Sequence, residues 1–217
     1  MKKYLIPLFF VFLGCGEHSL NDMLDYLKYS SSSESGLSLG LVPNTIIPDD
    51  MRSDVEDKMP IYRGTTPPDI SGKYLSSYNI ITGSSRNEDR DDVLAGKRYA
   101  DLYFAFTKKA DKIYYREIQI TDDGEASGNS DDLAVDVVGE GDNFTAYFIE
   151  VGESRGIRIK QSTVISGTMT SSGIKDFYYS FIMLEKGSDP NNKLVPVKTY
   201  RIFKDSDGLA EKNNWSF

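Results

Sequence analysis

The chain has 217 residues, a net charge of −8 and single copies of cysteine and histidine. An acidic chain repels phosphate backbones, which excludes nucleic acid as an expected partner. Cys15 and His18 both lie near the start, so the rest of the chain has no Ser-His-Asp or Cys-His catalytic site and no His-rich zinc site. We expect no cofactor. Fourteen Tyr and eleven Phe favour β-strands over helices.

The first 14 residues combine two lysines with an apolar run that is too short to span a bilayer. This combination is typical of a secretory signal peptide. The letters FLGC at 12–15 resemble the lipobox of bacterial lipoproteins, in which the cysteine is acylated and becomes the first residue of the mature chain. Phe12 stands where that family usually has Leu. We expect lipidation at Cys15; an ordinary leader with an incidental cysteine is the alternative.

Acyl chains on Cys15 would make the membrane the first partner of the protein, because each buried methylene contributes about 0.8 kcal/mol. In similar lipoproteins an Asp after the cysteine favours the inner membrane, and here Gly16 follows. We therefore expect a cell-envelope protein that is lipid-anchored, at the outer membrane where there is one. Cleavage removes two lysines and no acid, which leaves a net charge of −10.

Residues 15–60 are predicted to be a lipid-anchored tether, because Ser, Pro and acidic residues interrupt any sustained helical or strand periodicity of apolar residues. As a flexible coil, residues 16–60 would span about 35–40 Å. Apolar residues at 20, 23, 24 and 27 predict a short helix over 19–28, either a docking helix or one that frays in water. Met51, Val55 and Met59 have the spacing of a second short stripe, which could pack on the following domain.

Residues 61–217 show period-two alternation broken by turn residues, which predicts one β domain. The expected strands cover 71–81, 99–106, 113–120, 133–138, 144–151, 157–168, 177–185 and 195–204. About eight antiparallel strands with short turns form either a sandwich or an up-and-down barrel. We favour the barrel, because a single meander closes most directly by pairing its first strand with its last, which removes exposed edges.

Two resemblances accompany this pattern. Gly72-Lys73-Tyr74 opens the first strand and Arg201 lies on the last, as in lipocalin-like barrels, where a Gly-x-Trp opens strand one and a final arginine packs across the ring. The resemblance implies that Tyr74 and Arg201 form a barrel-closing pair. The phrases TPPDISGKY, ISGTMTSSGIKDF and EKGSDPNNKL, with YRIFKDSDGLA, are similar to a group of uncharacterised bacterial lipoproteins over residues 65–210, a resemblance that implies no activity.

Aromatic residues on the expected strands are the first candidates for a binding site. Because strand neighbours alternate between faces, paired tyrosines must be divided between the inside and the outside of a barrel. We expect four residues to contact a small ligand: Phe104, Tyr114, Tyr147 and Tyr179. Outward-facing tyrosines could instead stack on sugar rings, and all of them could simply fill the core.

Acidic residues are the second set of candidates. Asp205-Ser206-Asp207-Gly208 has part of the pattern of a calcium loop but lacks the later ligands, so we expect a turn there and no metal site. The acidic stretch at 122–132 is expected to be a solvated loop, with calcium binding as the alternative. Pairs of carboxylates could serve a glycoside hydrolase, but no motif marks them.

The sequence therefore favours a membrane-anchored, non-enzymatic binding module for a small apolar or amphipathic ligand. A surface protein that binds glycan or another envelope protein, with a packed interior, is the alternative. An enzyme that uses carboxylates is the least favoured. An apolar interior above about 300 Å³ would support ligand binding inside the barrel.

Overall fold

The computed structural model describes residues 39–86, 98–120, 124, 126–129 and 132–215, with only the backbone described at 126–129. Cys15, His18 and the helix expected over 19–28 lie outside the described residues. One helix and thirteen strands are found in the described part: α2(Asp49–Glu56), β1(Thr65–Thr66), β2(Gly72–Ser76), β3(Asn79–Ser84), β4(Arg98–Tyr99), β5(Asp101–Lys109), β6(Lys112–Ile120), β7(Ala126–Asn129), β8(Leu133–Glu140), β9(Asn143–Ser154), β10(Ile157–Met169), β11(Gly173–Lys186), β12(Tyr200–Asp205) and β13(Leu209–Lys212).

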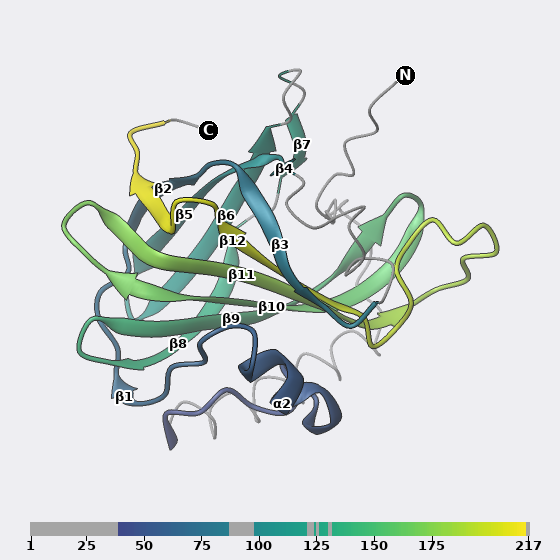
Figure 1. The fold of residues 1–217 in the computed structure, drawn as a ribbon, viewed down its shortest axis with the longest axis horizontal. Coiled ribbons are helices and arrows are strands. Elements are labelled where there is room, and N and C mark those ends of the chain that lie inside the picture. The colour runs from purple at the N-terminus through teal and green to yellow at the C-terminus, as the bar shows by residue number, and fades with distance from the viewer. Residues whose placement is uncertain (1–38, 87–97, 121–123, 125, 130–131, 216–217) are drawn as a thin grey trace.

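The strands form a closed antiparallel barrel of eight strands (Figure 1), which confirms the predicted fold class. The sheet runs β10-β9-β8-β6-β5-β2-β13-β11, and the pairing of β10 with β11 closes the ring. Strands at the start and end of the domain pair with each other, β2 with β13 and β3 with β12. β12, β3 and β4 extend the sheet beside β11, and β1 and β7 pair outside the ring.

Two expected strands differ most from the strands that are observed. The strand expected over 71–81 is interrupted between β2 and β3, where Tyr78 has a φ of 55°. Buried side chains hold this break: the Ser76 hydroxyl donates to Asn79 Oδ1 at 2.6 Å and lies 2.8 Å from an Asp205 carboxylate oxygen. The strand expected over 195–204 begins at Tyr200, and the chain turns at 206–208 and continues as β13.

The segment before the barrel packs on its outer wall from Val42 to Met59 (Figure 1), whereas the sequence placed residues up to 60 in a flexible tether. Met51 and Val55 are buried one helical turn apart on α2, as the apolar stripe allows. Asp49 and Asp50 occupy the first turn of α2, where acidic side chains favour the helix dipole. The apolar side chains of this segment cover strand residues that would otherwise be exposed to solvent. The free energy gained by this burial outweighs the conformational entropy that the chain loses when the coil becomes ordered.

Polar contacts also hold this segment. Ser162 Oγ donates to the Ile46 carbonyl at 2.6 Å, and the Tyr62 amide donates to Thr145 Oγ1 at 2.8 Å. Gly64 then passes so close to β8 that an added Cβ would lie 2.5 Å from the Gly139 carbonyl oxygen, so only glycine fits there. The outer surface of β8–β12 is therefore a second, covered apolar layer.

Candidate functional site

The barrel interior contains a continuous group of rings, here called the aromatic cluster: Tyr74, Phe104, Phe106, Tyr115, Phe144, Phe148 and Phe177. Phe104 stacks on Tyr74 with ring centroids 5.3 Å apart and on Phe177 at 5.0 Å. All seven side chains are at most 2% exposed. The Gly72 backbone leaves room for the Tyr74 hydroxyl, which donates to the Ile70 carbonyl at 3.0 Å. The aromatic cluster therefore fills its part of the interior.

Four polar side chains also point into the barrel, and they are here called the polar cluster: Glu117, Gln119, Glu150 and Gln161. Their inward orientation follows from strand alternation, because inward Tyr115 precedes Glu117 on β6 and inward Phe148 precedes Glu150 on β9. Gln161 is the register partner of Glu150 and donates from Nε2 to Glu150 Oε2 at 2.5 Å. β6 and β9 thus change from aromatic to polar along their inner faces.

The amide of Gln119 has an unusual environment. The residue is fully buried, and neither its Nε2 nor its Oε1 makes a hydrogen bond in the part of the chain that the structure describes. Oε1 of buried Gln161 is likewise without a partner there. Each such buried group costs about 1–3 kcal/mol, and native proteins keep few of them. The polar cluster therefore has hydrogen-bonding capacity that its own side chains leave unused.

Burial controls the charge of the two carboxyl groups. It raises the pKa of Glu117 to about 8, with a further contribution from the nearby Glu150 carboxylate. It raises the pKa of Glu150 to about 7, against the opposing effect of the hydrogen bond from Gln161. The Tyr115 hydroxyl donates to a Glu117 carboxylate oxygen. The carboxyls of the polar cluster are therefore largely protonated below neutral pH.

The connection between β11 and β12 covers the interior beyond the polar cluster. Buried Leu194 and Val195 of this loop join the apolar core with Ile157 and Ile159 of β10. Asp189 fixes the loop by accepting from the Lys193 and Leu194 amides at 2.8 and 3.0 Å. Figure 1 shows this loop at the side of the barrel opposite the tight turn between β10 and β11. Glu150 is only partly buried, whereas the other three members of the polar cluster are buried.

The four predicted ligand-contacting residues are divided between the two faces. Phe104 and Tyr179 point into the barrel and are buried. Tyr147 is buried on the outer wall among the residues that pack around α2. Tyr114 is half-buried on the outer face, with Lys109 Nζ 5.1 Å from the centre of its ring. The inward tyrosine of that pair is Tyr115, because the strand register places Tyr115 opposite Phe106.

Tyr74 and Arg201 are both buried and both face the interior, but the register separates them. Tyr74 lies opposite Lys212, whereas Arg201 lies opposite Ser84, ten positions farther along the β2–β3 segment. At a rise of about 3.3 Å per residue, this separation is much longer than either side chain. The Tyr74 ring stacks on Phe104 instead. The arrangement implied by the lipocalin-like resemblance is therefore not formed.

Asp205 to Gly208 form the turn between β12 and β13, as the sequence indicated. The Gly208 amide donates to the Asp205 carbonyl at 3.0 Å, and the Leu209 amide donates to Asp207 Oδ1 at 2.8 Å. Burial raises the pKa of Asp205 to about 7, with a hydrogen bond to Asp207 as the next cause. Of the acidic loop expected at 122–132, residues 126–129 form β7 against β6.

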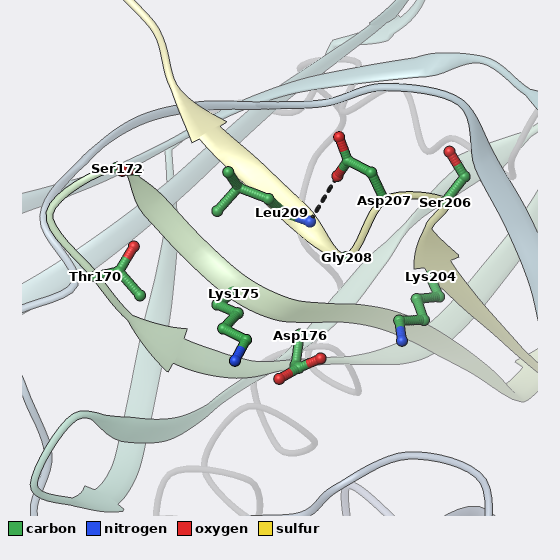
Figure 2. Close-up of a pocket in the computed structure, with 9 residues that line it drawn as sticks. All are labelled: Thr170, Ser172, Lys175, Asp176, Lys204, Ser206, Asp207, Gly208 and Leu209. Atoms are coloured by element: carbon green, nitrogen blue, oxygen red, sulfur yellow. Dashed lines mark hydrogen bonds between the residues drawn. The ribbon is translucent and has the colours of Figure 1, made fainter.

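A hollow of about 490 Å³ lies beside this turn on the outer surface. Figure 2 shows Lys175, Asp176 and Lys204 on one side of it and Asp207 on the other. Asp207 is engaged by the Leu209 amide, and Lys204 Nζ lies 5.2 Å from the centre of the Tyr178 ring. The residues that line the hollow include no aromatic side chain, so a sugar ring would have no ring on which to stack.

The described residues also set limits on what the chain can bind and on how it can be classified. Among the described residues, no group of three or more His, Cys, Asp or Glu side chains is placed to hold a metal ion. In the same residues no helix has both the length and the apolar character that crossing a bilayer requires. Comparisons with protein-family models, curated proteins and solved structures find no match to the chain. Of the expected resemblance to lipocalin-like lipoproteins, the eight-stranded barrel is therefore established, and no family is identified.

Proposed function

We propose that the protein binds a small amphipathic molecule inside its barrel and does so without chemical turnover. The observation that carries this proposal is the polar cluster beside the aromatic cluster, above all the buried Gln119 amide that makes no hydrogen bond in the described residues. A molecule with an apolar body and one polar group would match both clusters. Its polar group would satisfy buried groups that otherwise cost stability.

Two tryptophan reporters test whether a small molecule enters the barrel. Tyr179→Trp places a reporter inside, and Tyr114→Trp places a matched reporter on the outer face, each in a Trp215→Phe background. The full chain in detergent solution is titrated with 2-phenylethanol, a neutral amphipathic probe. We expect a saturable change in emission for Tyr179→Trp and none for Tyr114→Trp.

The same titration separates this proposal from the surface alternative. Equal changes at the two positions would indicate a general solvent effect and would contradict entry into the barrel. No change at either position would also contradict it and would favour a packed interior with binding at the surface. Native mass spectrometry of the full chain from its source provides a second readout, because a bound molecule would be retained after mild extraction.

We also propose that acyl chains on Cys15 hold the protein at the cell envelope. The support is the position of the only cysteine directly after the apolar leader. Metabolic labelling with an alkyne analogue of palmitate should label the full chain, and Cys15→Ala should abolish the label and release the protein from membranes. Label that survives in Cys15→Ala would disprove the anchor without affecting the proposal for the barrel.

A further inference from the structure

We infer that the molecule bound in the barrel carries a protonated amine, held by the Glu150 carboxylate and by the unused amide oxygens of Gln119 and Gln161. This inference rests on the proposed function and specifies its ligand class. An organic cation with an apolar body would place its ammonium group at the polar cluster and its body against the aromatic cluster.

The surroundings of Glu150 provide the first support. On its own strand it follows Phe148, and across the sheet Gln161 donates one hydrogen bond to Oε2. Among the residues that the structure describes, no lysine or arginine forms an ion pair with Glu150. A carboxylate accepts several hydrogen bonds, so its remaining positions suit the three donors of an ammonium group.

Unused acceptors and nearby negative charge provide the second support. Burial raises the pKa of the Tyr115 and Tyr179 hydroxyl groups, and the charges of Glu117 and Glu150 raise it further, which places both hydroxyl groups near the two carboxyl groups. Gln119 Oε1 and Gln161 Oε1 add two buried acceptors. An anionic ligand would instead face two carboxyl groups, Glu117 and Glu150, which would repel it.

Proton exchange follows from the state of the carboxyl. With its pKa raised to about 7, Glu150 is mostly protonated at pH 6 and mostly ionised at pH 8. When an ammonium group binds at pH 6, the carboxyl releases its proton to solvent and the N–H groups donate to the carboxylate. Binding should therefore strengthen as the pH rises from 6 to 8.

The groups around Glu150 determine this pH dependence. β6 contributes two titratable groups, Tyr115 and Glu117, and β11 contributes Tyr179. Two neighbouring strands contribute neutral side chains: Gln161 and Thr163 from β10, and Leu133 and Val135 from β8. Arg201 faces the interior from β12, two strands beyond β10. Glu117 titrates near pH 8, so its ionisation adds to the same trend.

Three matched probes test the inference on the full chain: phenethylamine, 2-phenylethanol and 3-phenylpropionate. They share a phenyl group and differ in a cationic, neutral or anionic end. Affinities come from ligand-observed saturation-transfer NMR at pH 6 and pH 8. At pH 8 we expect phenethylamine to bind at least about tenfold more tightly than 2-phenylethanol, as a charge-assisted hydrogen bond implies.

Two charge-neutralising variants on β9 locate the effect. Glu150→Gln should remove the preference for the amine and leave the affinity for 2-phenylethanol nearly unchanged. Glu153→Gln removes the same charge from an exposed position on the same strand and should keep the preference. Glu150→Asp keeps the charge and should retain part of the preference for the amine. Circular dichroism of each variant shows whether the barrel is folded.

The outcomes separate the two proposals. Equal binding of the amine and the alcohol would overturn the inference but leave binding in the barrel intact. No binding of either would overturn both. Tightest binding of 3-phenylpropionate would overturn the inference in favour of an anionic ligand. Loss of the preference in Glu153→Gln would show that general surface charge attracts the amine, which also overturns it.

Discussion

The aromatic cluster and the polar cluster share one barrel interior but differ in how completely their groups are satisfied. Rings of the aromatic cluster are stacked, and its Tyr74 hydroxyl has a backbone partner. The polar cluster keeps buried amide atoms without hydrogen bonds and two carboxyl groups with raised pKa values. One part of the interior therefore supplies stability, and the other gives up stability for a capacity to bind.

The largest expected effect comes from the aromatic cluster. Phe104→Ala removes the ring that stacks on both Tyr74 and Phe177, and the cavity it leaves should lower the free energy of unfolding by about 3–5 kcal/mol. Urea unfolding followed by circular dichroism measures the change. A loss below about 1 kcal/mol would show that this part of the interior is loosely packed, and the contrast between the clusters would fail.

The second effect is the pH dependence of stability. Glu117 and Glu150 have pKa values of about 8 and 7 in the folded state, against an ordinary value of 4.5. Between pH 5 and pH 8 the folded state keeps protons that the unfolded state loses, so stability should fall as the pH rises, by up to about 1.4 kcal/mol per pH unit for each carboxyl that is still protonated in the folded state. Asp205, with a pKa of about 7, adds to the same fall.

Glu117→Gln provides the control for this pH dependence. It removes one of the three titrations, so thermal unfolding midpoints between pH 5 and pH 8 should decline less steeply than in the unmodified protein. An equal slope in the variant would mean that Glu117 ionises normally in the folded state.

A smaller effect of opposite sign is expected at Gln119. Gln119→Leu replaces two buried amide atoms that lack hydrogen bonds with apolar atoms of similar size, and should raise the free energy of unfolding by about 1–3 kcal/mol. The same urea titration measures it. If the variant is less stable, the Gln119 amide has a stabilising role and the polar cluster is structural.

The smallest effect should appear outside the barrel. Tyr114 lies half-buried on the outer face beside Lys109, so Tyr114→Ala should change the free energy of unfolding by at most about 0.5 kcal/mol. It should also leave the affinity for 2-phenylethanol unchanged. A change in that affinity would move the binding site to the outer surface.

The fold was predictable because alternation and turn residues act locally. β5, β6 and β8 to β11 lie where period-two patterns stand in the sequence, and closure by pairing the first strands with the last followed from the meander. β7 lies in the stretch that was expected to be a loop. β13 was not predicted, because its four residues carry no alternation of their own and depend on their pairing with β2 and β11.

The polar cluster could not be predicted from alternation. On β6 the isoleucines at 118 and 120 alternate with Glu117 and Gln119, so hydrophobicity alone would turn the isoleucines inward. The structure has the opposite orientation, which Tyr115 sets by packing among Phe104, Phe106 and Phe148. The only local signal was the Tyr-Tyr pair at 114–115, whose inward member the sequence did not identify.

Tertiary contacts also determine on which face of the barrel wall the other candidate residues lie. Phe104 and Tyr179 face the interior as proposed for ligand contacts, but Tyr147 is covered on the outer wall by the segment that includes α2. That cover depends on contacts such as Ser162 Oγ with the Ile46 carbonyl, more than a hundred residues apart in the chain. Patterns within a window of ten residues carry no information on such contacts.

The most direct test of the polar cluster is the ¹³C NMR signal of its glutamate carboxyls. In full chain labelled at glutamate Cδ, with Glu117→Gln and Glu150→Gln used for assignment, the Glu150 signal should titrate with a midpoint near pH 7. At pH 6, phenethylamine should shift that signal to its ionised position. A Glu150 carboxyl that titrates near pH 4.5 and does not respond to phenethylamine would contradict the account.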